Sequence, residues 1–137
     1  MKTGPPHVTM LATPGIDHLI PLAELAKRLA SRHGATATLL TFASTASATQ
    51  RALLVSLPPS VASRPLPPVD LSDLPRDADI ETLMSEECAR SLPALTRILS
   101  ELRETTRLVA FVADQFGMDS FDAARDAGVR TRASSCP

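Results

Sequence analysis

Short apolar runs alternate along the chain with longer segments in which apolar residues recur every three or four positions. The apolar runs are bounded by glycine, proline or polar residues and predict strands over residues 7–13, 35–42, 61–66 and 107–113. The amphipathic segments predict helices over residues 18–33, 44–57, 79–106 and 118–127. This alternation is typical of an α/β fold with a Rossmann-like parallel sheet and helices on both faces.

Prolines refine the predicted elements. Pro21 is tolerated only in the first turn of a helix, so the first helix should begin close to His18. Pro93 lies inside the longest helical segment and predicts either two helices or one bent helix there. Pro65 and the prolines just after it confine the third strand to an edge of the sheet. The polar segment 69–78 is then a long loop, of a kind that often carries function.

Two titratable residues follow strands that the expected topology brings together. His18 comes after the first strand and its Pro-Gly turn, and Asp114 directly follows the fourth strand. In the common strand order 3-2-1-4 these strands are neighbours, and ligands bind at their carboxyl ends. A histidine at a helix N-terminus stays available as a base, and a nearby carboxylate fixes its tautomer. The pair would suit deprotonation of a weakly acidic hydroxyl, while the plainer alternative for each residue is a helix cap or a surface position.

Composition narrows the classes of function. A length of 137 residues with 44% hydrophobic and 21% charged residues fits one globular domain with a core of its own. The net charge of −1, four Phe and the absence of Tyr and Trp argue against nucleic-acid binding. No apolar run approaches the roughly 20 residues of a membrane span, and the N-terminus lacks the apolar region of a secretory signal. We therefore expect a cytoplasmic protein.

The other polar candidates favour structural roles. His7 and His33 are expected at the surface, and Met84 and Cys88 share a helical face with leucines and are expected to pack in the core. The second cysteine, Cys136, is far from the first, so neither a metal site nor a disulfide framework is indicated. Four loosely spaced carboxylates match no metal-binding pattern and are expected in a solvated loop: Asp70, Asp73, Asp77 and Asp79.

Several separated motifs occur in a specific order along residues 5–129. They are Pro6-His7-Val8, the run from Thr13 to Leu22, Glu24-Leu25-Ala26-Lys27-Arg28-Leu29, Leu66-Pro67-Pro68-Val69, Asp73-Leu74-Pro75, Ile80-Glu81-Thr82, Arg90-Ser91-Leu92-Pro93 and the run from Ala113 to Asp119. Together they resemble the N-terminal part of plant UDP-glycosyltransferases, and above all the hydroquinone (phenolic) glucosyltransferases.

The resemblance implies a GT-B fold, in which two Rossmann-like domains bind acceptor and donor in the cleft between them. Residues 1–129 would be an incomplete N-terminal acceptor domain. The implied reaction transfers glucose from UDP-glucose, with inversion, to a hydroxyl of a small phenolic acceptor. The resemblance implies no metal and no cofactor besides the donor substrate. His18 matches the catalytic base of the family, and Asp114 its partner acid.

The resemblance also implies binding residues. Those near the donor are Thr13, Gly15 and Asp17, and those that line the acceptor pocket are Glu81, Thr82, Gln115 and Phe116. Asp17 stands where the family usually has glycine, which adds a carboxylate where the donor diphosphate would approach.

After Val129 the sequence departs from the family pattern, and residues 130–137 are expected to form a disordered tail. The donor-binding motif of the family carries tryptophan, which this sequence lacks. The alternative function is therefore a truncated, inactive fragment that binds small phenolic molecules weakly. A stand-alone dinucleotide-binding protein is disfavoured, because the turn after the first strand is not GxGxxG.

Overall fold

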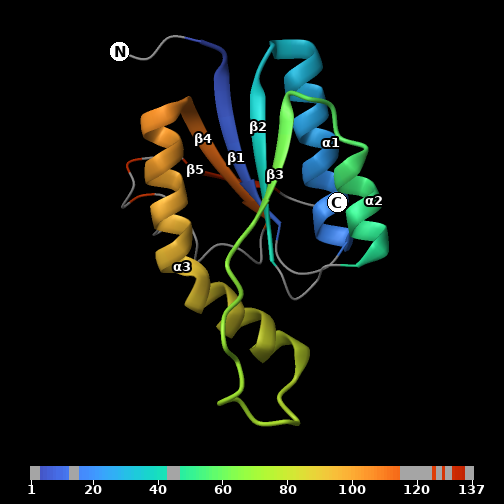
Figure 1. Cartoon of the computed structure of the whole chain (residues 1–137), viewed down its shortest axis with the longest axis vertical. Helices are drawn as coiled ribbons and strands as arrows, with labels where there is room; N and C mark the ends of the chain where they lie inside the picture. Colours follow the sequence, from blue (N-terminus) through green and yellow to red (C-terminus); the bar gives the residue numbers. More distant parts are fainter. Residues whose placement is uncertain are drawn as a thin grey trace.

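The computed structural model describes residues 4–12, 16–42, 47–114, 125, 128 and 131–134. Strands and helices alternate through most of this part of the chain (Figure 1). The elements are β1 (Pro6–Leu11), α1 (Ile16–His33), β2 (Thr36–Thr41), α2 (Ala48–Val55), β3 (Val61–Pro65), α3 (Ile80–Thr105), β4 (Arg107–Asp114) and β5 (Thr131–Ser134). None of the described helices is long and apolar enough to cross a membrane.

The strands form one parallel sheet in the order β3-β2-β1-β4-β5. The predicted order 3-2-1-4 is therefore confirmed, and β3 lies at an edge as its prolines predict. β1 pairs with both neighbours along its length, so that Leu11 lies opposite Leu40 on β2 and opposite Ala113 on β4.

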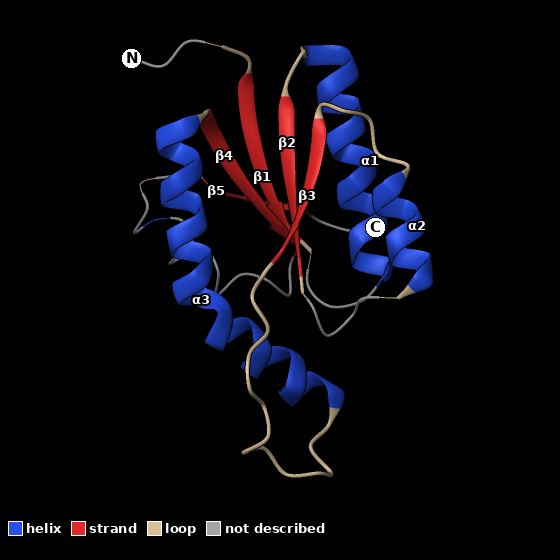
Figure 2. Cartoon of the chain, in the orientation of Figure 1, coloured by secondary structure: helices blue, strands red, loops and turns tan. Residues whose placement is uncertain are grey.

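The helices cover both faces of the sheet: α1 and α2 lie on one face and α3 on the other (Figure 2). Because successive strand residues point to opposite faces, and both faces are covered, β1 and β2 are buried along nearly their whole length. The cluster on the α1 side comprises Val8, Met10, Ala12, Leu19, Leu22, Ala23, Ala26, Ala37, Leu39, Val61 and Val112. The cluster on the α3 side comprises Leu11, Leu40, Phe42, Leu66, Leu95, Ile98, Leu99, Phe111 and Ala113. Cys88 packs against the α3-side cluster, as predicted.

The second helix begins later than its periodicity indicates. Residues 44–57 predict a helix, whereas α2 covers only Ala48–Val55. Ser47 is its N-cap, with extended backbone angles and a hydroxyl that accepts a hydrogen bond from the Gln50 N–H at 3.1 Å. Several hydroxyl residues precede this helix, and only the actual backbone conformation decides which of them acts as the cap.

The longest helix is continuous, with Pro93 inside it. Figure 1 shows α3 changing direction partway along its length, which agrees with the predicted alternative of one bent helix. Asp79 caps its N-terminus by accepting a hydrogen bond from the Thr82 N–H at 2.7 Å. The first half of α3 and the loop before it extend beyond the carboxyl ends of the strands (Figure 1).

The tail expected to be disordered contains a strand. Thr131–Ser134 form β5, which pairs in parallel with β4 so that Phe111 lies opposite Thr131. The outer edge of β4 presents unpaired backbone N–H and C=O groups, which a short strand satisfies whatever its side chains. Apolar patterning cannot reveal such a strand. The domain boundary near residue 130 stays a prediction, and the predicted helix 118–127 falls almost wholly outside the described residues.

His7 is buried, so its expected surface position is wrong. The residue is 7% exposed. Its Nδ1 lies 2.6 Å from Oγ1 of Thr36, and its Nε2 lies 2.8 Å from Oγ1 of Thr38. Both hydroxyls belong to β2, and burial lowers the pKa of His7 from its usual 6.5. The sequence around His7 gives no sign of these partners, because they lie about 30 residues away.

The lowered pKa of His7 predicts a loss of stability in mild acid. Below the usual pKa of 6.5 the unfolded chain binds a proton that the folded chain takes up only at lower pH. The free energy of unfolding should therefore fall as the pH decreases from about 7.5 to 5.5. Urea denaturation at several pH values measures this free energy. His7→Gln should make it less dependent on pH, whereas His33→Gln, at an exposed site, should leave its pH dependence unchanged. An unchanged slope in His7→Gln would contradict the assignment.

Candidate functional site

The topology brings the start of α1 and the end of β4 to one edge of the sheet. β1 and β4 are parallel neighbours that run together to the pair Leu11 and Ala113. The chain leaves β1 at this edge and enters α1 at Ile16, while β4 ends at Asp114. Backbone positions far apart in sequence are therefore close to the same carboxyl edge, where open α/β sheets bind their ligands.

His18 lies in the first turn of α1, which begins at Ile16, close to the predicted start. Its side chain is half-buried. Leu19 and Leu22 fix the helix on the sheet, since each is 1% exposed. Asp114 is the last residue of β4, and its side chain lies outside what the structure describes. The contact between the two side chains therefore stays a prediction.

Of the other predicted residues, some lie in the part of the chain that the structure describes and some do not. The backbone of Asp17 lies in the first turn of α1, and its side chain lies outside what the structure describes. The predicted residues outside the described part are Thr13, Gly15, Gln115 and Phe116.

Glu81 and Thr82, predicted to line the acceptor pocket, are exposed in the first turn of α3. This turn belongs to the half of α3 that extends beyond the carboxyl ends of the strands (Figure 1). α3 therefore holds both residues on the side of the sheet to which β1 and β4 run. Among the described residues, no group of three or more His, Cys, Asp or Glu side chains could hold a metal ion.

Arg90 ties the loop before α3 to the helix, a role that its sequence motif does not indicate. Its Nη1 donates to Asp73 Oδ1 at 2.6 Å and to the Asp70 carbonyl at 2.6 Å, and its Nη2 donates to Asp73 Oδ2 at 2.9 Å. Its Nε donates to Glu86 one turn earlier at 3.1 Å. The hydrogen bonds from Arg90 lower the pKa of Asp73, and those to Asp73 and Glu86 raise the pKa of Arg90. No sequence pattern marks contacts that span such a loop.

Loss of Arg90 should release this loop without unfolding the domain. In Arg90→Gln the backbone amides of residues 70–78 are expected to exchange with deuterium faster, because the loop loses its fork of hydrogen bonds. The pKa of Asp73 should rise toward its usual value, and the urea midpoint should change little because the Asp73 carboxylate of this ion pair is 64% exposed. Exchange mass spectrometry and NMR titration measure both effects. Arg76→Gln in the same loop is the control, and equal amide protection in both variants would contradict the role of Arg90.

No family model matches the chain, but individual relatives do. It is 50% identical over 123 residues to UDP-glycosyltransferase 72B3 of Arabidopsis thaliana. This match covers 88% of this chain and 26% of that protein. It is 46% identical over 121 residues to the hydroquinone glucosyltransferase of Rauvolfia serpentina, over 87% of this chain and 26% of that protein. The chain thus spans about a quarter of the length of these relatives.

Solved structures show the same relationship in three dimensions. The UGT2 of Phytolacca americana, in complex with UDP-2fluoro-glucose and pterostilbene, matches with a TM-score of 0.89 and 34% identity, over 98% of this chain and 31% of that one. A UDP-glucosyltransferase from Polygonum tinctorium that glucosylates indoxyl matches with a TM-score of 0.87 and 42% identity, over 98% of this chain and 30% of that one. In sequence and in fold, the chain is therefore similar to part of the plant UDP-glycosyltransferases.

Proposed function

We propose that this chain is the acceptor-side part of a glucosyltransferase that moves glucose from UDP-glucose to a hydroxyl of a small phenolic molecule, with inversion. The observation that carries the proposal is the parallel pairing of β1 with β4, which brings the start of α1 and Asp114 to one edge of the sheet. The similarity to a hydroquinone glucosyltransferase and to a structure with bound UDP-2fluoro-glucose and pterostilbene supports the substrate classes.

In this reaction His18 removes the proton from the acceptor hydroxyl. The resulting oxygen attacks the anomeric carbon of glucose from the face opposite UDP, and UDP leaves with the bonding electrons. Asp114 acts through His18: it orients the imidazole and stabilises the imidazolium that forms. The proposal needs no metal and no cofactor besides the donor substrate.

The binding residues follow the same arrangement. The turn between β1 and α1 would approach the donor through Thr13, Gly15 and Asp17. The acceptor would lie between the ends of α3 and β4, near Glu81, Thr82, Gln115 and Phe116. The exposure of Glu81 and Thr82 on the extending half of α3 supports this side for the acceptor.

The test is glucoside formation from UDP-glucose and hydroquinone, detected by mass spectrometry, with the anomeric configuration read by NMR. It should be run on the chain and on a hybrid in which the chain replaces the matched part of UDP-glycosyltransferase 72B3. We expect the β-glucoside from the hybrid. A folded hybrid that binds UDP-glucose but forms no glucoside would overturn the proposal.

A second candidate function is acceptor binding without transfer, and the quarter-length match to the relatives favours it for these 137 residues acting alone. It predicts that hydroquinone or pterostilbene shifts the NMR signals of the chain while no UDP is released from UDP-glucose. UDP release by the chain alone would exclude this candidate.

A further inference from the structure

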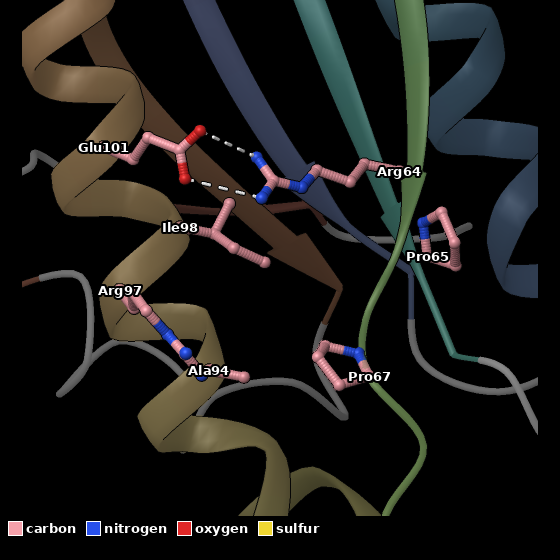
Figure 3. Close-up of a pocket in the computed structure, with 7 residues that line it drawn as sticks. All are labelled: Arg64, Pro65, Pro67, Ala94, Arg97, Ile98 and Glu101. Carbon is pink, nitrogen blue, oxygen red and sulfur yellow. Dashed lines mark hydrogen bonds and ion pairs between the residues drawn. The ribbon is translucent and has the colours of Figure 1, made fainter.

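A pocket of about 320 Å³ lies between the end of β3 and the second half of α3, on the face of the sheet opposite α1 (Figure 3). We call it the β3–α3 pocket. Its lining consists of Arg64, Pro65, Pro67, Ala94, Arg97, Ile98 and Glu101. The four residues from α3 recur at helical spacing and form one stripe of the helix. The pocket shares no residue with the candidate active site, and its volume is within the range of about 300–1,000 Å³ usual for small-molecule sites.

The charges in this pocket do not balance. Arg64 reaches from β3 toward α3 and forms a fork with Glu101, with nitrogen–oxygen distances of 3.5 and 3.4 Å (Figure 3). These contacts are long, and the side chains are 41% and 54% exposed, so the pair is weak and open to exchange. Within the described ranges the Arg97 guanidinium has no hydrogen-bond or ion-pair partner. The lining therefore carries two positive charges, on Arg64 and Arg97, and one negative charge, on Glu101.

The rest of the lining is apolar. Ile98 is 5% exposed and belongs to the α3-side core cluster, so it forms a fixed floor. The ring of Pro67 and the methyl group of Ala94 supply the apolar walls (Figure 3). The rigid Pro67 ring loses little conformational freedom when a flat ring packs against it.

We propose that the β3–α3 pocket binds a small aromatic carboxylate, with its carboxylate on Arg97 and Arg64 and its ring against Pro67, Ala94 and Ile98. A guanidinium presents paired N–H donors that match the two oxygens of a carboxylate. The apolar floor and walls select a planar body over a bare inorganic anion. This site is independent of the proposed transfer reaction, because it does not use His18.

The test is an NMR titration of the full chain with benzoate, benzamide and acetate. Benzoate should shift the backbone amides of residues 64, 66, 94, 97, 98 and 101 in a saturable manner, and less at high salt. Benzamide keeps the ring without the charge, and acetate keeps the charge without the ring. Each should bind at least about tenfold more weakly, as expected when a charge-assisted hydrogen bond or the ring contact is lost.

Two substitutions in the pocket make opposite predictions, which separates binding from misfolding. Arg97→Gln should weaken benzoate binding by about tenfold or more, toward the level of benzamide. Glu101→Gln should strengthen it, because Arg64 then loses the carboxylate that competes with the ligand. Arg76→Gln and His18→Ala should leave it unchanged.

Equal affinity for benzoate and benzamide, shifts confined to other residues, or weaker binding in Glu101→Gln would each overturn the proposal. Equal affinity for benzoate and acetate would reduce the site to a general anion site and would overturn the assigned ligand class.

Discussion

Replacement of His18 by alanine is expected to lower kcat/KM for glucosyl transfer to hydroquinone by about 10²–10⁴-fold, the usual contribution of a general base. The imidazole is the proposed acceptor of the phenolic proton, and alanine cannot accept it. The measurement is the rate of glucoside formation by the hybrid with the Arabidopsis relative, with and without the substitution.

The matched control for this variant is His33→Ala at the exposed C-terminal end of the same helix, which should keep full activity. UDP-glucose affinity should be similar in all three proteins, because the proposed role concerns the acceptor proton. A His18→Ala hybrid with more than about a tenth of the original rate would contradict the assignment of the base.

Replacement of Phe111 by alanine should lower the free energy of unfolding by about 3–5 kcal/mol. Phe111 is 0% exposed in the middle of β4 and belongs to the cluster that joins the sheet to α3. Alanine would leave a cavity between rigid elements that cannot close it. Since whole domains are stable by only about 5–15 kcal/mol, the variant should be close to unfolding at room temperature.

Urea denaturation measures the effect of Phe111→Ala. Val109→Ala is the matched control on the same strand, because Val109 is 38% exposed, and it should cost about 1 kcal/mol or less. Similar losses in both variants would mean that β4 does not hold the core as described.

The architecture was predictable because it depends on periodic burial along the chain. Strands that are apolar on both sides, such as Met10 and Leu11 on β1, predict a sheet covered on both faces, and the structure has this arrangement. Pro65 predicts an edge strand because it cannot donate a hydrogen bond to a further strand, and β3 is at the edge.

What the sequence did not predict depends on contacts between distant residues or on backbone pairing alone. His7 contacts two threonines of a neighbouring strand, and Arg90 binds the Asp73 carboxylate and the Asp70 carbonyl of the preceding loop. β5 is held by backbone hydrogen bonds that no side-chain pattern encodes. At the candidate site, the topology supports the placement of His18 at the carboxyl edge, while its contact with Asp114 stays a prediction.

The central position of β1 has a consequence for synthesis on the ribosome. β1 pairs with β2 soon after it emerges, but its other neighbour, β4, follows about 100 residues later. Until then the nascent sheet has helices on one face only, and Leu11, Leu40 and Phe42 have no α3 to cover them. An unpaired strand edge beside an uncovered apolar face is prone to aggregation, so this intermediate should be a substrate for cotranslational chaperones.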